Sequence, residues 1–213
     1  MPRPSNTDAR KAEIVEALLT VMTERGYRGA SVSEIARAAG LAPGLVHYHF
    51  ENKQEILLAL VARLEGSLRE RYRARTARAR TARQRLLGWL DAHVERGPDA
   101  DPRAVACWSL VGAEALTQPE VRVLYAAAIA RSLDELAELV RDALREDGRD
   151  PRAARRIAAA LLSAIEGAFR IASAAPDALP EGFAAPMLRR MAEGLVAAEP
   201  AGAPSAERRK GAA

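Results

Sequence analysis

Residues 26–57 read GYRGASVSEIARAAGLAPGLVHYHFENKQEIL, and this stretch decides the fold. Ser31 and Glu34 have the spacing of a capping box, in which each side chain accepts a hydrogen bond from the other residue's backbone N–H. Gly40 ends the short helix that follows, because glycine readily adopts the left-handed conformation of a sharp turn. Pro43 suits the first turn of the next helix, where no N–H is needed. The stretch therefore predicts two short helices joined by a tight turn.

The segment before this stretch predicts a longer helix over about residues 8–25. Its apolar positions recur at helical spacing, and they are Ile14, Ala17, Leu18, Val21 and Met22. The residues expected to pack against this stripe are Ile35, Ala36, Ala39, Leu41, Val46 and Phe50. The third helix then leaves at a steep angle with its N-terminal end outward, which is the end that enters a DNA major groove. The sequence thus predicts a helix-turn-helix reader.

The remainder of the chain is also expected to be helical. Alanine, leucine, arginine and glutamate dominate, aromatic residues make up 4%, and period-2 strand patterns are missing. Helical patterns run over about residues 52–75, 82–95, 103–115, 120–146, 152–174 and 184–197, and turn residues separate them. The predicted fold is all α: a three-helix DNA-binding domain at 1–51, a domain of about six helices at 52–198, and a flexible tail at 199–213.

Several protein classes are disfavoured by the sequence. No phosphate-binding loop, nucleophile elbow, H-E-x-x-H pair or G-x-G-x-x-G motif is present, so we expect no enzyme and no cofactor. The chain has one cysteine and no signal-peptide pattern, which indicates the cytoplasm. Charges interrupt its most apolar stretch, residues 157–175, so no membrane span is expected. His47 and His49 point about 200° apart on a helix, so no metal site is expected.

The head of the chain resembles the tetracycline-repressor (TetR) family of transcriptional regulators. The residues that match the family's pattern are Gly26, Tyr27, Ser31, Val32, Ile35, Ala36, Ala39, Gly40, Leu41, Gly44, Val46, His49, Phe50, Lys53, Ile56 and Leu57. Ala42 replaces the family's usual N-cap serine, and His47 replaces a tyrosine that contacts phosphate. The resemblance implies that Pro43, Gly44, Leu45 and Tyr48 face base edges or sugars. It also implies that Ser33, His47 and Lys53 face phosphates.

The rear of the chain resembles the BetI-like subgroup of the same family, through residues 119–125 and 165–169. In the family, the last two long helices of each protomer form a four-helix bundle across a two-fold axis. Two apolar stripes fit such an interface: Ile157, Leu161, Ile165 and Phe169, and then Met187, Leu188, Met191 and Leu195. Both stripes could equally belong to an internal core, but a reader of paired half-sites needs a partner, which favours a homodimer.

An effector cavity is expected among the middle helices, lined by Trp89, His93, Cys107, Trp108, Val111, Glu114 and Tyr125, with Leu64 and Leu68 nearby. The predicted function is therefore a one-component regulator, a repressor released from a palindromic operator by a small molecule. A helical adaptor without an effector is the alternative, and an activator role stays open. Residues 69–85 carry eight arginines and one glutamate, which indicates either a solvated face or an anion-binding surface.

Overall fold

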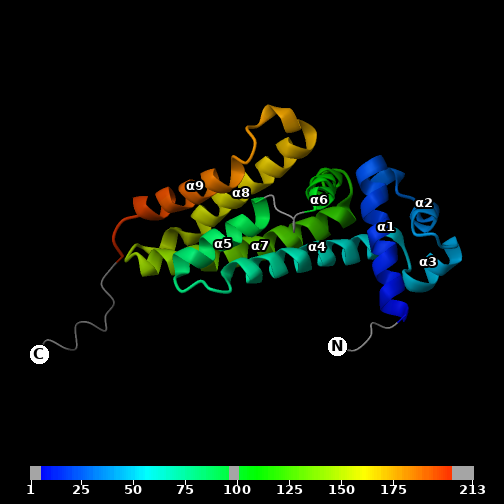
Figure 1. Ribbon diagram of the computed structural model, residues 1–213, viewed down its shortest axis with the longest axis horizontal. Coiled ribbons are helices and arrows are strands. Elements are labelled where there is room, and N and C mark those ends of the chain that lie inside the picture. Colours follow the sequence, from blue (N-terminus) through cyan, green and yellow to red (C-terminus); the bar gives the residue numbers. More distant parts are fainter. Residues whose placement is uncertain (1–5, 96–100, 203–213) are drawn as a thin grey trace, which may run out of the picture. The chain divides into compact units, whose positions relative to one another are not determined.

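The computed structural model describes residues 6–95 and 101–202, and their regular structure is helical except for one isolated bridge between Arg149 and Ala201 (Figure 1). The fold class is as predicted, and the predicted helix ends agree with the observed ones to within a few residues. The helices are α1 (Asn6–Gly29), α2 (Val32–Ala38), α3 (Pro43–His49), α4 (Lys53–Thr76), α5 (Ala82–Val94), α6 (Pro102–Glu114), α7 (Pro119–Glu146), α8 (Ala154–Ala174) and α9 (Ala184–Ala198), with 3-10 turns at Pro151–Ala153 and Pro176–Ala178.

The chain forms two compact units. The first unit comprises residues 1–70, 98–129 and 169–178, and it contains α1–α3, the first part of α4, α6 and the start of α7. The second comprises residues 71–97, 130–168 and 179–213, and it contains α5 and α9. The predicted functional domains divide the chain elsewhere, because α4, α7 and α8 each contribute residues to both units.

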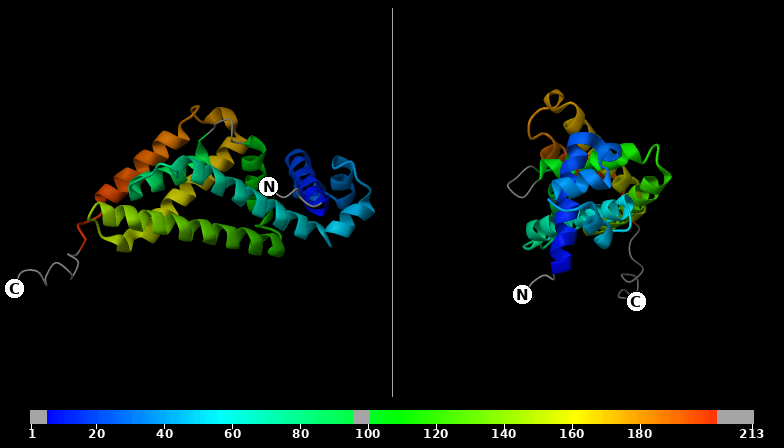
Figure 2. Two further views of the ribbon diagram at one scale, coloured as in Figure 1. Left: turned by 60° about the horizontal axis from the view of Figure 1, so that its bottom comes forward. Right: turned by 90° about the vertical axis from the view of Figure 1, so that its right-hand side faces the viewer.

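The core of the first unit forms where α1, α2, α3, α4 and α6 meet. Ile14, Leu18 and Met22 of α1 are fully buried, as are Ile35 of α2 and Val111 of α6. Ala36, Val46 and Phe50 are buried too, while Ala39 and Leu41 are partly buried against the same cluster. The predicted packing of the reader on the α1 stripe is therefore confirmed, and α1, α2 and α3 lie together (Figures 1 and 2).

Two glycines make the sharp bends of the reader. Gly26 has φ 70° and breaks α1 before its last turn, and Gly40 has φ 67° between α2 and α3. Side chains other than glycine rarely adopt this backbone region, since Cβ then crowds the backbone. The stop predicted at residue 26 is thus a kink, because helical hydrogen bonding resumes beyond it.

The capping box predicted at Ser31 is half formed. Its side chain accepts from the backbone N–H of Glu34 at 3.2 Å, as expected. The reciprocal bond is replaced, since the Ser31 N–H donates to the Gly29 carbonyl at 3.0 Å. The Glu34 carboxylate instead pairs with Arg25 and Arg37, which outcompete an amide N–H because they are charged.

In the second unit, α5 packs against α9 through an ion pair as well as apolar contacts. Asp91 of α5 is buried, and its two carboxylate oxygens accept from Arg189 of α9, both at 2.6 Å. Two parallel charge-assisted bonds fix orientation as well as distance. Asp91 and Arg189 therefore set how α9 lies along α5.

The α8 stripe predicted to face a partner is largely internal. Leu161 and Ile165 are 0% exposed, and Ile157 and Leu188 are also buried, so these four have no surface left for a second chain. This corrects that part of the predicted interface. A period of 3.6 residues marks a buried face but does not say what buries it. Phe169 and Leu195 are half-buried, and Met187 and Met191 are exposed.

The opposite face of α8 carries small residues, Ala159, Ala160 and Ser163, with arginines toward both ends of the helix. By length and composition alone, residues 151–174 form a helix that could cross a membrane, and this differs from the sequence-based expectation. The difference arises because alanine raises the mean hydropathy. Only 28% of its most apolar window is buried inside the chain.

The first residues of the predicted tail are paired. The backbone N–H of Asp150 donates to the Pro200 carbonyl, and the backbone N–H of Gly202 donates to the Gly148 carbonyl, both at 2.9 Å. The Arg149 guanidinium donates to the Glu199 carbonyl. Residues 199–202 are therefore held, and the prediction of a tail is wrong for them. Backbone pairing of this kind leaves no signature in side-chain composition. The basic triplet at 208–210 lies outside the described residues.

Candidate nucleic-acid interface

Helix α3 presents a row of exposed residues around one buried anchor. Val46 is 1% exposed and holds the helix on the core. Pro43, Gly44, Leu45, His47 and Tyr48 are all exposed, which brings the predicted base-facing residues and His47 onto one short helix. Tyr48 is 79% exposed and Leu45 38%, and exposed apolar groups that gather on one surface are typical of interaction sites. The surface therefore offers apolar contact through Leu45 and a hydroxyl through Tyr48.

The start of α3 lacks a side-chain cap. Ala42 has the extended backbone of an N-cap residue, with φ −72° and ψ 144°, but forms no capping bond. Pro43 follows in the first turn, as predicted. The next helix is different, because the Asn52 side chain caps α4 by accepting from the Glu55 N–H at 3.0 Å.

The residues predicted to face phosphates have different surroundings. Ser33 on α2 is exposed and open to solvent. Lys53 begins α4, and its ammonium donates to the Tyr27 carbonyl at 2.9 Å and lies 4.0 Å from the centroid of the Tyr27 ring. Burial lowers the pKa of the Lys53 ammonium, while the nearby Glu114 carboxylate acts in the opposite direction. Lys53 thus links α4 to the α1 kink, whatever else it contacts.

The predicted effector residues divide between the two units. Cys107 and Val111 are fully buried in the first unit, and burial raises the pKa of the Cys107 thiol to about 12. Trp108 and Tyr125 form a ring contact there, with centroids 5.0 Å apart, and Glu114 pairs with Arg28. An effector site among these residues stays a prediction.

The other two predicted effector residues are stacked in the second unit. The rings of Trp89 and His93 have centroids 3.7 Å apart, and His93 Nδ1 lies 2.8 Å from the Trp89 carbonyl oxygen. Burial lowers the pKa of His93 to about 4, so the ring stays neutral at physiological pH. A hollow of about 330 Å³ in the same unit is lined by neither residue. Its walls come from α5, α9, the end of α7 and the residue after it, with Leu86, Ala143, Asp147, Arg190, Glu193 and Val196 among them.

The arginine run at 69–85 is partly engaged within the chain. Arg71 donates to the Glu95 carbonyl at 2.7 Å, Arg75 pairs with Glu95 at 3.2 Å, and Arg83 pairs with Glu193 at 2.7 Å. Arg69, Arg73, Arg78 and Arg80 are exposed. The run is thus a mixture of packing residues and solvated residues.

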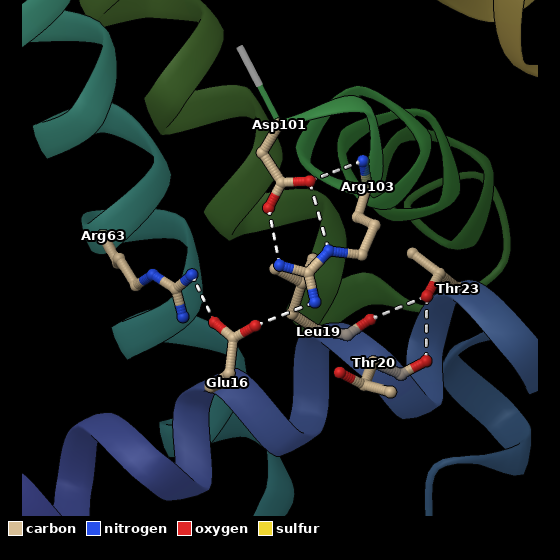
Figure 3. A network of polar contacts seen from close by, with 7 residues as sticks. All are labelled: Glu16, Leu19, Thr20, Thr23, Arg63, Asp101 and Arg103. Carbon is tan, nitrogen blue, oxygen red and sulfur yellow. Dashed lines mark hydrogen bonds and ion pairs between the residues drawn. The ribbon is translucent and has the colours of Figure 1, made fainter. Parts of the chain in front are cut away.

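A polar network that the sequence did not reveal joins three helices (Figure 3). The Glu16 carboxylate of α1 accepts from Arg63 of α4 at 2.5 Å and from Arg103 of α6 at 2.9 Å. Asp101 holds the same Arg103 guanidinium at 2.8 Å and also caps α6 by accepting from the Arg103 N–H at 2.9 Å. These bonds to Arg103 lower the pKa of the Asp101 carboxyl. The partners are far apart in sequence, so no local spacing indicates them.

Two family descriptions match the chain. Residues 14–60 match "Bacterial regulatory proteins, tetR family". Residues 82–197, more than half of the chain, match "BetI-type transcriptional repressor, C-terminal". The chain belongs to the TetR family. The second match confirms the resemblance of the rear of the chain to the BetI-like subgroup. Because both descriptions are of TetR regulators, they also support the expectation that this member is not an enzyme.

Similar transcriptional and metabolic regulators align over part of their length. BetI of Rhizobium meliloti (strain 1021) is 33% identical over 136 residues, which are 62% of this chain and 66% of the relative. The fatty acid metabolism regulator protein of Bacillus subtilis (strain 168) is 33% identical over 81 residues, 38% of this chain and 42% of the relative. The chain thus spans less than two thirds of each of these two relatives.

Solved structures share the TetR fold along nearly the whole chain. A transcriptional regulator of Pseudomonas aeruginosa PAO1 has a TM-score of 0.76 at 22% identity, with 95% of this chain and 94% of that one covered. A transcriptional regulator of Saccharomonospora viridis in complex with choline has a TM-score of 0.70 at 23% identity, covering 91% and 97%. These likenesses establish the helical architecture behind the reader.

Proposed function

We propose that this TetR-family member is a one-component transcriptional repressor that binds a palindromic operator as a homodimer and leaves it when a small molecule binds. The observation that carries the proposal is the exposed face of α3. Leu45 and Tyr48 are exposed there, on a helix that the buried Val46 holds against the core. The match of residues 14–60 to the tetR family supports the same role.

The proposed division of labour follows the position of each residue. Pro43, Gly44, Leu45 and Tyr48 would contact base edges or sugars, since they lie on the exposed face of α3. Leu45 can meet a thymine methyl group, and the Tyr48 hydroxyl can donate to a base or accept from one. Ser33, His47 and Lys53 would contact phosphates, which position a reader but carry no sequence information.

The effector is proposed to bind behind the reader, where the Trp108 and Tyr125 rings lie together. By their names, one relative regulates fatty acid metabolism and one similar structure holds choline, so these names point to no single ligand for this chain. A helical adaptor remains the second candidate from sequence, and it differs in that no small molecule would release its DNA. We place the activity in the cytoplasm, where a bacterial operator lies.

The test starts from randomised duplex DNA, from which the purified protein selects its own site. Tyr48→Ala should weaken binding to the selected duplex by about 5- to 150-fold, because one base-reading contact contributes roughly 1–3 kcal/mol. Leu58→Ala is the matched control, since Leu58 is another exposed apolar residue, 55% exposed, but lies on α4. Fluorescence anisotropy reports both affinities. An equal effect of the two substitutions, or the absence of any selected duplex, would refute the assignment.

A further inference from the structure

The reader, which consists of helices α1–α3, contacts α6 at two places within the first unit. At one place Glu16 of α1 binds Arg103 at the start of α6. At the other, beyond the α1 kink, Arg28 pairs with Glu114 at 3.6 Å and donates to Thr117 at 3.2 Å, at the end of α6. Each contact therefore joins α1 to a different end of α6. The two contacts lie roughly 16 Å apart along α6.

Apolar packing lies between these two polar contacts. Cys107 and Val111 of α6 are fully buried in the cluster that contains Ile14, Leu18 and Met22 of α1. Apolar packing has little directional preference, so on its own it allows small rotations and slides. Charge-assisted bonds at both ends add direction, because each has a preferred distance and angle. Together they define one orientation of α1 on α6.

Glu16 has a special place in this arrangement, since it binds arginines from two helices. Arg63 reaches it from α4 and Arg103 from α6 (Figure 3). Asp101 already holds Arg103, so little extra ordering of that side chain is needed when Glu16 binds it. The side chains are partly exposed, 41% for Glu16 and 47% for Arg103, and one such exposed pair usually shifts an equilibrium by no more than about fivefold.

We propose that Glu16 is a positioning residue for DNA reading, which fixes the orientation of the reader on α6 through Arg103 and so sets which half-site spacing the dimer accepts. The proposal rests on the proposed function. Asp101 supports the Glu16–Arg103 contact, because its single carboxylate both caps α6 and orients Arg103. A change at the start of α6 would therefore reach α1 directly. The Arg28–Glu114 pair restrains the other end.

The experiment compares Glu16→Gln with Glu13→Gln. Glu13 is the matched control, because it lies on the same helix and pairs with Arg10 of that helix, at 2.6 Å, so its loss removes a carboxylate without releasing α6. The probes are the duplex selected by the wild-type protein and versions with one base pair inserted or deleted at its centre. Thermal unfolding of each variant is recorded alongside.

Glu16→Gln should bind the selected duplex about three- to tenfold more weakly, while it loses less affinity than wild type when the spacing changes. Glu13→Gln should match wild type on every probe. Arg103→Gln should change binding in the same direction. The double variant with Glu16→Gln should lose less affinity than the sum of the two single losses, because the Glu16–Arg103 contact is removed by both substitutions. Arg103→Gln also provides the test if Glu16→Gln fails to fold.

Three results would overturn the proposal. The first is equal behaviour of Glu16→Gln and Glu13→Gln. The second is a uniform loss on all spacings that follows a lower unfolding temperature, which is what a merely stabilising residue would give. The third is additive losses in the double variant. A wild-type protein that selects no DNA would instead refute the proposed function itself, and the positioning role with it.

Discussion

Lys53 is proposed to contact a DNA phosphate, and it also links α4 to the α1 kink. Its surroundings allow these two roles to be separated by experiment. Its ammonium has three donors, one of which already bonds the Tyr27 carbonyl. The remaining donors can reach a phosphate while the first stays in place. Its position at the start of α4, beside the α1 kink, would also transmit the loss of the side chain to the reader. A loss of affinity alone therefore does not identify a phosphate contact.

We predict that Lys53→Ala weakens binding to all DNA sequences similarly and lowers the salt slope of binding by roughly one unit, because one neutralised phosphate releases about one counterion. Lys11→Ala is the matched control, since Lys11 also lies over an aromatic ring, 5.5 Å from the Phe50 centroid, without a predicted phosphate contact. Titrations of the selected duplex at several salt concentrations give the slopes. A weaker affinity with an unchanged slope would assign Lys53 to positioning.

Individual residues also show which parts of the candidate site could be predicted from the sequence. Pro43, Leu45 and Tyr48 were predicted from the resemblance to the TetR family, and the structure leaves all three exposed on a helix held by the buried Val46. Glu16 was missed, although it lies on the predicted first helix. Its partners, Arg63 and Arg103, are 47 and 87 residues away, and no periodicity encodes a contact between separate helices.

Single elements were predictable where the local chemistry is sufficient. Helix ends coincide with Gly40, Pro43, Asn52 and Pro119, whose backbone restrictions and capping groups act within a few residues. The faces of α8 were not predictable in the same way. Its buried stripe packs inside the chain, whereas its alanine-rich side is exposed, and only tertiary packing decides between the two.

At the level of one element, the uncapped start of α3 gives a stability prediction. Ala42→Ser should raise the free energy of unfolding by about 1 kcal/mol, because the backbone already has N-cap geometry and the hydroxyl can accept from a backbone N–H in the first turn of α3. Urea unfolding measures the difference. Ala38→Ser, on the exposed side of α2, adds a hydroxyl away from any N-cap and should be neutral or slightly destabilising. Equal effects of both serines would mean that no cap forms.

On the scale of the whole molecule, the second unit has exposed apolar and small side chains that no residue within 6–95 or 101–202 covers. On α9, Met187 and Met191 are 45% and 40% exposed. On α8, Ala159, Ala160 and Ser163 are exposed, and small side chains of this kind let another helix approach closely. These residues, rather than the buried Leu161 and Ile165, are the ones available to a second copy. A reader of a palindromic site requires such a copy.

We therefore predict that Met187→Glu combined with Met191→Glu converts a dimer into a monomer. Two-fold symmetry would place four carboxylates in one apolar interface, and each buried unpaired charge costs several kcal/mol. The dissociation constant of the dimer should therefore rise by about a hundredfold or more. Sedimentation velocity measures the change, and affinity for the selected duplex should fall with it. Val123→Glu, at a residue that is 72% exposed in the first unit, should leave the dimer intact. A wild-type monomer, or a double variant that dimerises as tightly as Val123→Glu, would show that α8 and α9 do not meet a second copy, and the half-site model would then need another interface.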